Sequence, residues 1–501
     1  MNFSIVLIAK NEAVTLPRLL ATLIEFRDRN GEIVLLDTGS SDTTCALAAD
    51  FGCKVHSHVG DFRTTFDPAR VKALSDQFVV DGEEPLTDAP RSVFNYAAAR
   101  NFAAAQATND CIVMPDCDEL FLALDIDRLE KIFAGGIETA GCRYIFGRDP
   151  AGHIQIQYLR QRFYDRRRTQ WKGMIHECLS TTVEMSAIPD DVVFIEHRQN
   201  LTTDRSYNVL GLAWDCHVDP GDARNSHYLG RELYYSKRYR SAIQELARHV
   251  AMNGWPSERA QSWLYIGDSY GELASPTLQI EAYTHAFEVD SSRRAPLLSL
   301  ARLYFNRGDE QRTACYAAAA LEIQSKLFYM DMQTDYTSYP HELLYWAHFR
   351  LGNVELARAH WRKALAYQPS NPYCLRDAGF FMPTPRVSIA IAEEGEGAIQ
   401  RFSMVALYPN LQLTAITTAD IDPAALPPDL LALLAGEVGF LFVFASGQQP
   451  LPGFVVHALL EFQDAFPDGD GILALSGENE VFGPACWMAS AKYLRSLQPA
   501  S

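Results

Sequence analysis

Residues 111–119 read CIVMPDCDE, a short apolar run that ends in three carboxylates within four positions. The run at 111–114 is typical of a strand that is buried in a sheet. Acids at the carboxyl end of such a strand lie in the crevice where open α/β sheets bind ligands. Asp116 and Asp118 stand two positions apart and can share a hard divalent cation that also takes phosphate oxygens. The alternative is a helix cap, with Asp116 or Asp118 preceding a helix that begins near Glu119.

The same arrangement, an apolar strand followed by polar groups, occurs twice earlier in the chain. Strands are predicted at 5–9, 32–37 and 54–56, with helices at 15–26 and 46–51 between them. Alternation of this kind predicts right-handed crossovers and a mainly parallel sheet. Lys10-Asn11-Glu12 follows the first strand, and Asp37 ends the second. Together with Asp116 and Asp118, these residues form three candidate ligand groups at the ends of strands. Helix capping does not readily explain why polar groups recur at all three strand ends.

Length, charge and cysteine content narrow the class of protein. At 501 residues the chain is long enough for roughly three domains of ~150 residues each. A formal net charge of −18 argues against a general nucleic-acid binder or an anionic membrane surface as the main partner. Ten cysteines without a CxxC pair favour reduced thiols in a cytoplasmic protein and argue against zinc or a disulfide framework. No run approaches the ~20 apolar residues of a membrane span, and the N-terminus is expected to be a strand rather than a signal peptide.

Four segments, in this order, resemble family 2 glycosyltransferases of the GT-A fold: IVLIAKNEAVTLPRLL, GEIVLLDTGSSDTT, AAARNFAAAQATNDCIVMPDCDELF and QWKGMIHE. The sequence is similar to the subgroup with a W-x-G-x-x-H-E motif, which includes lipopolysaccharide-core glucosyltransferase relatives and the sublancin-type peptide S-glycosyltransferases. The resemblance covers about residues 1–210. Residues 63–92 depart from the pattern and are interpreted as an inserted surface loop or lid.

The resemblance implies that a nucleotide-diphosphate sugar lies across the strand ends. It implies base and ribose contacts for Ile8, Ala9, Asn11 and Glu12, with Asp37 beside the nucleoside and Arg100 and Asn101 at the phosphates or donor sugar. It also implies that Asp116 approaches the ribose or the metal and that Asp118 binds the Mn²⁺ or Mg²⁺ that bridges the diphosphate. The alternatives are that Arg100 is a surface cation and that Glu12 is an acid at a helix start, favoured by the helix dipole.

A second polar cluster, Trp171 to Glu177, is expected on the acceptor side of the site. Glu177 is the candidate general base or anchor for the nucleophile, with His176 beside it. His197 ends the apolar stretch 192–195 and is the candidate histidine ligand of the metal, with His176 as the second choice. The alternatives are a polar strand end for 176–177 and a structural role for either histidine.

A basic stretch lies between the two clusters. It consists of Arg160, Arg162, Arg166, Arg167, Arg168 and Lys172. This stretch could attract an anionic acceptor such as a nucleic acid or a phosphorylated glycan. A solvated strand with charged neighbours is the favoured interpretation.

From residue 226 to about 372 the sequence repeats with a period of about 34 residues, in the tetratricopeptide (TPR) pattern. The clearest copy is YWAHFRLGNVELARAHWRKALAYQPSNP, and three earlier copies begin near 228, 263 and 300. Stacks of such repeats build a concave surface that binds peptides or subunits. The alternative is that the repeats only support the front domain.

The last 120 residues follow a linker at 382–385. Strands are predicted at 386–391, 411–416 and 438–445, with a helix from 392 to about 408. The order echoes the front domain, but Ala445, Ser446 and Gly447 stand where an acidic motif would follow the third strand. The hypothesis is a shortened, degenerate GT-A-like module without catalysis that serves assembly.

The sequence therefore predicts an α/β GT-A catalytic domain at 1–205, TPR-like repeats at 206–375 and a small α/β domain at 384–501. The predicted function is metal-dependent, inverting sugar transfer from a nucleotide-diphosphate sugar, with UDP favoured by analogy. A peptide, protein or glycan is the favoured acceptor, while nucleic acid and homo-oligomerisation are left open. The alternative is a non-catalytic adaptor in which the repeats bind a protein and the front domain binds a nucleotide.

Overall fold

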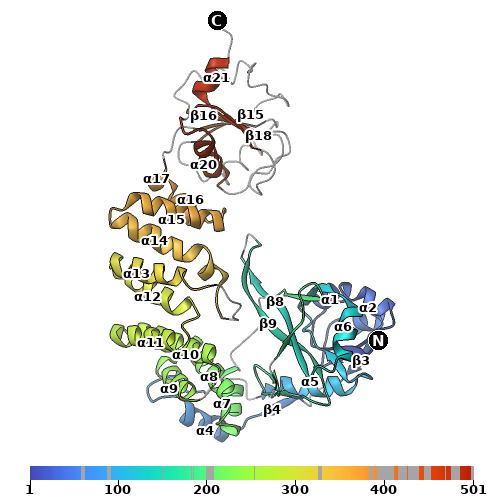
Figure 1. Cartoon of the computed structure of the whole chain (residues 1–501). Coiled ribbons are helices and arrows are strands. Elements are labelled where there is room, and N and C mark those ends of the chain that lie inside the picture. Colours follow the sequence, from blue (N-terminus) through green and yellow to red (C-terminus); the bar gives the residue numbers. More distant parts are fainter. Residues whose placement is uncertain are drawn as a thin grey trace. The chain divides into compact units, whose positions relative to one another are not determined.

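The structure is a computed structural model of the chain (Figure 1). It describes residues 1–57, 62–86, 92–149, 152–181, 183, 185–198, 208–252, 254–324, 330–382, 387–391, 411–415, 426, 439–444, 453–468, 470–475 and 486–497. The chain forms two compact units, one of residues 1–300 with 319–336 and the other of residues 301–318 with 337–501. The first repeats thus belong to the same unit as the front domain.

The front of the first unit is a mixed nine-stranded sheet with the order β3-β2-β1-β6-β9-β8-β13-β7, in which β12 pairs with β8. The strands are β1 (Phe3–Ala9), β2 (Glu32–Asp37), β3 (Lys54–Ser57), β6 (Cys111–Val113), β7 (Glu119–Leu124), β8 (Thr139–Arg148), β9 (Ile154–Asp165), β12 (Ser186–Ala187) and β13 (Val193–His197). Strands β3, β2, β1 and β6 are parallel neighbours, as predicted. The other half mixes both directions. β12 and β13 run parallel to β8, whereas β9 runs antiparallel to both β6 and β8. The long β8–β9 hairpin needs no crossover helix, so antiparallel pairing follows from its short connection.

Helices cover the sheet on both sides of its buried strands. They are α1 (Leu16–Ala21), α2 (Ile24–Asp28), α3 (Thr44–Phe51), α5 (Tyr96–Ala105) and α6 (Ile126–Ala134). The single helix predicted at 15–26 is two short helices, although Leu16, Leu19, Leu20 and Leu23 are all buried as expected. Strands β1 and β2 are buried on both faces, which explains their nearly continuous apolar sequence.

The inserted segment 63–92 has a defined structure in its described part and does not form a surface loop. It contains β4 (Arg63–Thr65), which pairs with β5 (Ser92–Phe94), and helix α4 (Pro68–Phe78). Val71, Leu74 and Phe78 of α4 lie in one hydrophobic core with residues of helix α7 (Asn208–Val218). The insertion therefore joins the front domain to the helices that follow it.

The helical middle consists of TPR-like helix pairs, and the four predicted copies correspond to four described pairs, whose helices are labelled in Figure 1. The pairs are α8 (Ala223–Tyr235) with α9 (Tyr239–Ala251), α10 (Pro256–Glu272) with α11 (Pro276–Val289), α12 (Ala295–Asn306) with α13 (Glu310–Leu321), and α14 (Ser338–Arg350) with α15 (Val354–Tyr367). Small residues lie where paired helices approach closely, as the pattern predicts. At Gly230, for example, an added Cβ would lie 2.5 Å from the side chain of Leu246. The helix η1 (Gln333–Tyr336) stands where the period breaks before α14.

Replacing Gly267 by Ala is expected to destabilise the pair α10–α11. An added Cβ would overlap the ring of Tyr283, which is 1% exposed and held by a 2.6 Å hydrogen bond from its hydroxyl to Asp268. We expect the free energy of unfolding to fall by about 1–3 kcal/mol in urea denaturation. The control Gly221→Ala meets its nearest atom at 3.6 Å, and a loss there as large as that of Gly267→Ala would contradict the packing argument.

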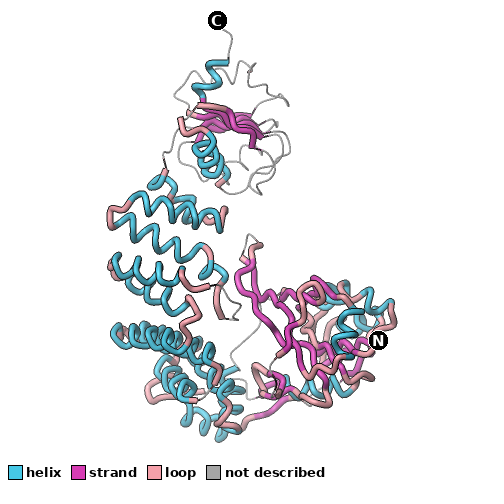
Figure 2. The backbone as a smooth tube through the Cα atoms, viewed as in Figure 1, coloured by secondary structure: helices cyan, strands magenta, loops and turns pink. Residues whose placement is uncertain are grey.

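The end of the chain forms a five-stranded mixed sheet with the order β15-β14-β16-β18-β17 (Figure 2). The strands are β14 (Val387–Ile391), β15 (Leu411–Ala415), β16 (Phe440–Phe444), β17 (Ile472–Leu475) and β18 (Cys486–Ser490), with α20 (Phe454–Ala465) between β16 and β17 and α21 (Ala491–Leu497) at the end. Short helices α16 (Pro372–Arg376) and α17 (Ala378–Phe381) precede this sheet. The helix predicted up to about 408 and most of the predicted linker lie outside the described residues.

This C-terminal sheet has the strand order and directions of the front sheet's centre, β2-β1-β6-β9-β8. In both sheets the first three strands in chain order are parallel with the first strand in the middle. In both, the fifth strand then adds antiparallel to the third, and the fourth adds antiparallel to the fifth. The predicted echo of the front domain is therefore present in the topology of the strands.

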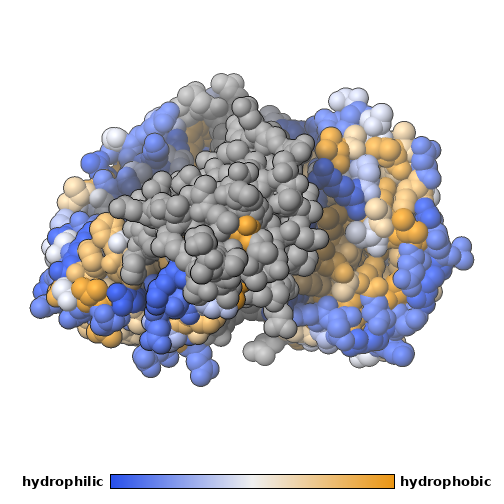
Figure 3. All heavy atoms as spheres, turned by 90° about the horizontal axis from the view of Figure 1, so that it is seen from above, coloured by the Kyte–Doolittle hydropathy of each residue, from blue (hydrophilic) through white to orange (hydrophobic). Residues whose placement is uncertain are grey.

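The described surface carries hydrophobic side chains in patches between hydrophilic ones, as Figure 3 shows for one face. Among the described helices, none combines the length and the apolar character that a membrane crossing requires.

Candidate functional site

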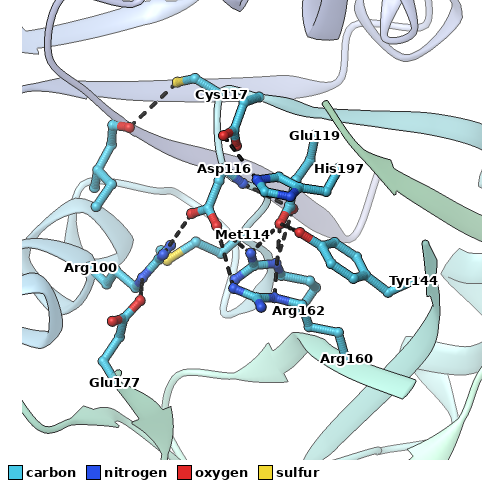
Figure 4. A network of polar contacts seen from close by, with 12 residues as sticks. Arg100, Met114, Asp116, Cys117, Glu119, Tyr144, Arg160, Arg162, Glu177 and His197 are labelled. Atoms are coloured by element: carbon cyan, nitrogen blue, oxygen red, sulfur yellow. Dashed lines mark hydrogen bonds and ion pairs between the residues drawn. The ribbon is translucent and has the colours of Figure 1, made fainter. Parts of the chain in front are cut away.

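The carboxyl end of β6 leads into a buried network of opposite charges (Figure 4). Asp116 accepts a 2.6 Å hydrogen bond from Nη2 of Arg100 on α5, and its other oxygen accepts from Arg162 on β9. Burial alone would raise the pKa of Asp116, but the neighbouring guanidinium groups of Arg100, Arg162 and Arg160 hold it well below its usual range. Asp116 is therefore ionised and oriented by arginines from two different elements.

Glu119, three residues after Asp116, is fully buried and belongs to the same network. Arg162 donates to it from Nε at 3.0 Å and also from Nη2, and the Tyr144 hydroxyl donates at 2.8 Å. The backbone N–H of Asp116 donates to the same carboxylate at 3.1 Å, which fixes the turn between the two acids. Residues 119–124 form strand β7, so the helix expected under the capping alternative is wrong. The acids of 116–119 serve a polar network instead of a helix start.

Asp118 points to a different side from Asp116 and meets His197 at the end of β13. The distance from Nε2 of His197 to Oδ2 of Asp118 is 3.0 Å, and the imidazole stacks on Phe146 with ring centroids 5.3 Å apart. The structure thus brings together two of the three residues predicted as metal ligands, from positions 79 apart in the chain. The third, Asp116, is bonded to Arg100 and Arg162 instead. Within the described residues, no three His, Cys, Asp or Glu side chains gather closely enough to hold a metal ion by themselves. The Asp118 carboxylate fits Mg²⁺ or Mn²⁺, which take oxygen ligands and keep waters and phosphate oxygens as further ones, and His197 would add one nitrogen ligand.

The residues predicted on the nucleoside side lie where β1 and β2 end. The loops after these two strands are joined to each other by hydrogen bonds. Asn11 has a positive φ of 57°, its side-chain oxygen accepts from the Ser41 N–H at 2.7 Å, and its own N–H donates to Ser40. Asp37 accepts from the Ser40 N–H at 2.9 Å. These contacts place Asn11 and Asp37 on one polar turn at the edge of the sheet.

The backbone of β1 reaches the same edge. The Ile8 carbonyl accepts a 3.5 Å hydrogen bond from the Cys117 thiol, and the Ala9 carbonyl accepts from the Thr38 N–H at 2.9 Å. Burial raises the pKa of Glu12, and the charges of Asp118 and Asp116 add to this effect. The Glu12 carboxylate accepts a hydrogen bond from the Thr15 hydroxyl and lies within electrostatic range of the acids at the end of β6.

Arg100 connects this edge to the predicted acceptor side. Its side chain is 3% exposed, so the alternative of a surface cation is wrong. Its Nε donates to Glu177 at 2.7 Å while its Nη2 holds Asp116, and the guanidinium lies 4.8 Å from the centre of the Trp171 ring. Its third nitrogen, Nη1, is buried without a hydrogen-bond partner among the described residues. A buried guanidinium N–H without a partner is a fit for an oxygen of a bound anion.

Asn101 and His176, also predicted at the site, are directed elsewhere. The Asn101 side chain exchanges two 2.9 Å hydrogen bonds with the backbone of Trp171, which orders strand β10 (Trp171–Lys172). The His176 ring stacks on Tyr228 of α8 at 4.3 Å and accepts a 2.8 Å hydrogen bond from Arg231 at Nε2. Because an arginine only donates, Nε2 of His176 is unprotonated and the ring is neutral. Only Glu177 of the pair 176–177 contacts the charge network.

Acidification is expected to weaken this contact of His176. Burial lowers the pKa of His176 to about 4, with Arg231 lowering it further and Glu232 and Glu177 opposing. The unfolded chain has a histidine pKa near ~6.5, so neutral His176 contributes its full stability above that pH and loses it as the pH falls toward the folded value.

The measurement is the melting temperature of the wild type and of His176→Asn, which tolerates the positive φ of 53° and does not titrate. The gap between the two proteins should narrow as the pH falls from 7.5 to 5. A gap that stays constant over this range would contradict the assignment of a neutral, buried ring.

The basic stretch is neutralised by acids of the front domain and, at Lys172, by Asp222 just before α8. Arg160 and Arg162 face Asp116 and Glu119, and the others pair as Arg166 and Arg167 with Asp110, Arg167 with Asp165, Arg168 with Glu138, and Lys172 with Asp222. The charged neighbours agree with the favoured interpretation, but the solvated strand is wrong for Arg162, which is 1% exposed. The pairs give no support to a nucleic-acid surface.

Sequence reasoning missed Glu119, Arg162 and Tyr144 as parts of the site. The available signal was Arg160 and Arg162 at alternate positions of one strand, since a charged residue facing a core implies a buried partner. It also missed Asp215 and Arg231, which contact the segment 171–177 from helices distant in sequence.

Comparison with known proteins finds similarity in sequence to a TPR repeat protein. A TPR repeat-containing protein of Synechococcus elongatus is 32% identical over 117 residues, which are 23% of this chain and 20% of that protein. The chain thus covers about a fifth of the relative's length. No family model matches the sequence.

Solved structures of TPR proteins show a weak resemblance. The crystal structure of MamA is 14% identical with a TM-score of 0.27, covering 32% of this chain and 86% of MamA. YrrB, described as a TPR protein with an unusual peptide-binding site, is 15% identical with a TM-score of 0.27, covering 35% of this chain and 82% of YrrB. TM-scores of this size are too low to carry an argument about function.

Proposed function

We propose that the front domain is a metal-dependent glycosyltransferase that uses a nucleotide-diphosphate sugar. The observation that supports this proposal best is the double contact of Arg100, which binds Asp116 at the predicted donor side and Glu177 at the predicted acceptor side. Asp118 with His197 lies beside this pair, and Glu12 lies within electrostatic range of Asp116 and Asp118. One small region therefore holds groups that could bind a cation (Asp118 and His197), bind a diphosphate (Arg100) and accept a proton (Glu177).

In this proposal the acceptor's nucleophile attacks the anomeric carbon as the bond from that carbon to the nucleotide diphosphate breaks. Glu177, held as a carboxylate by Arg100, receives the proton of the nucleophile. Arg100 presents its unpaired Nη1–H to an oxygen of the diphosphate, where negative charge develops. A divalent cation at Asp118 and His197, when bound, neutralises charge on the leaving diphosphate.

We propose further that the TPR-like repeats bind a protein or peptide. The supporting observation is the 32% identity to a TPR repeat-containing protein, together with the four helix pairs of the structure. Stacked repeats of this kind form extended surfaces suited to peptides. The comparisons favour this function over sugar transfer, so a non-catalytic adaptor whose front domain binds a nucleotide is the competing proposal.

Calorimetric titration of the full chain with UDP, GDP, CDP and TDP, each with and without Mn²⁺, tests the front domain. Tight binding of one nucleotide only when the metal is present is the expected result and supports a donor site. Absence of binding under every condition would overturn the transferase proposal and leave the repeats as the functional part. Binding without dependence on metal would favour the adaptor.

A further inference from the structure

The segment 171–177, which carries Glu177, is held by helices that precede and begin the repeats. Asp215 on α7 accepts hydrogen bonds at Oδ2 from the backbone N–H groups of Met174 at 2.6 Å and of Ile175 at 3.4 Å. A backbone held by one carboxylate at two successive N–H groups has little freedom to rotate.

Two further contacts flank this one on either side of the segment. Lys172 forms a 2.8 Å ion pair with Asp222, which precedes α8, and Arg231 of α8 donates to His176 at 2.8 Å. Met174 and Ile175 are 3% exposed and share a hydrophobic core with residues of α7 and α8. The contacts extend over the whole segment from Lys172 to His176.

The backbone of the segment needs such support. Gly173 has a φ of 88° and His176 a φ of 53°, so two of the four residues before Glu177 lie in the left-handed region. A non-glycine residue such as His176 is strained in that region, and surrounding contacts must offset the strain. At Gly211 of α7 an added Cβ would lie 2.5 Å from Ile175, so the helix backbone approaches the segment closely.

We propose that α7 and α8 act as part of the catalytic site, with Asp215 as a positioning residue that fixes the segment 171–177 and thereby the carboxylate of Glu177. This inference rests on the proposed transferase function for its effect on turnover, but its structural part stands without it. It assigns the beginning of the helical region a role beyond binding a partner or supporting the fold.

Hydrogen exchange of the full-length protein tests the structural part directly. In Asp215→Ala the amides of 174–177 should exchange about tenfold faster or more, while strands β1 and β2 keep their protection. Burial raises the pKa of Asp215 to about 6, so the neutral Asp215→Asn, which keeps an acceptor oxygen, should retain most of the wild-type protection. The control Asp219→Ala changes an exposed residue of the same region and should leave the segment unchanged. Unchanged exchange in Asp215→Ala would overturn the inference.

Turnover tests the link to Glu177. Calorimetry with UDP and Mn²⁺ and hydrolysis of UDP-glucose are measured on the same variants. We expect the affinity for the nucleotide to stay within about twofold of the wild type in both variants. The rate of hydrolysis should fall by roughly 10²-fold in Asp215→Ala, because a small misplacement of a reacting group has an effect of this size. It should recover in Asp215→Asn. Faster exchange with unchanged hydrolysis would overturn the positioning role. If the wild type neither binds nor hydrolyses the nucleotide, the transferase proposal fails, while the exchange result still decides whether Asp215 holds the segment.

Discussion

Asp118→Asn abolishes metal-dependent nucleotide binding and reduces sugar transfer by at least about 10³-fold if the front domain is a transferase. In the wild type, Oδ2 of Asp118 lies 3.0 Å from Nε2 of His197. Asparagine has the same size and can still hydrogen-bond to His197, but it lacks the negative charge that a divalent cation requires. Asp116 cannot replace it, because both of its oxygens are engaged by Arg100 and Arg162.

The measurement is calorimetric titration with UDP in the presence of Mn²⁺, on the wild type, on Asp118→Asn and on the control Asp50→Asn. Asp50 is exposed on α3, so its substitution should leave binding unchanged. Full transfer or undiminished metal-dependent binding by Asp118→Asn would exclude this residue as a metal ligand. Thermal unfolding of the variant close to that of the wild type would show that any loss is chemical.

Arg162→Met is expected to be the most destabilising single change in the front domain. Arg162 is 1% exposed and donates to Asp116 and to Glu119, which is fully buried. Removing it leaves a carboxylate without its charged partner inside the core, and breaking such a pair costs about 3–5 kcal/mol. Methionine fills much of the volume of the lost side chain. The loss in free energy of unfolding therefore comes from the missing charge and not from a cavity.

Because the chain has two compact units, a single unfolding curve would mix their signals. Urea denaturation followed by hydrogen exchange of residues 111–124 and 154–165 reports the stability of the sheet that contains the network. The matched control is Arg143→Met on the neighbouring strand β8, where the pair with Asp190 is 34% and 49% exposed and is worth less than about 1 kcal/mol. Equal losses in the two variants would contradict the claim that the buried network, rather than strand packing, is responsible.

The sequence by itself determined the local elements and where polar groups follow them. The strands at Phe3–Ala9 and Glu32–Asp37 and the four helix pairs were readable, because their apolar residues recur with the period of the element that buries them. The position of Asp37, Asp116 and Asp118 at one edge also followed, since parallel strands end on the same side of a sheet. For the C-terminal sheet, the succession of its first three strands was predicted to echo the front domain, whereas β17, β18 and the strand order came from the structure.

Only the tertiary structure decided what the acids of 116–119 contact. Asp116 and Glu119 meet arginines of α5 and β9, and Asp118 meets His197 of β13, at separations in sequence of 16 to 79 residues. The helix cap was wrong because residues 119–124 pair with β13 as a strand. The parallel part of the sheet was predicted, but the antiparallel hairpin β8–β9 makes the sheet mixed. Likewise, Asp215 reaches the segment 171–177 through the fold alone. Side-chain pairs of this kind depend on how elements that are distant in sequence pack together. The pattern of residues within one segment therefore does not predict the partner of a buried charge.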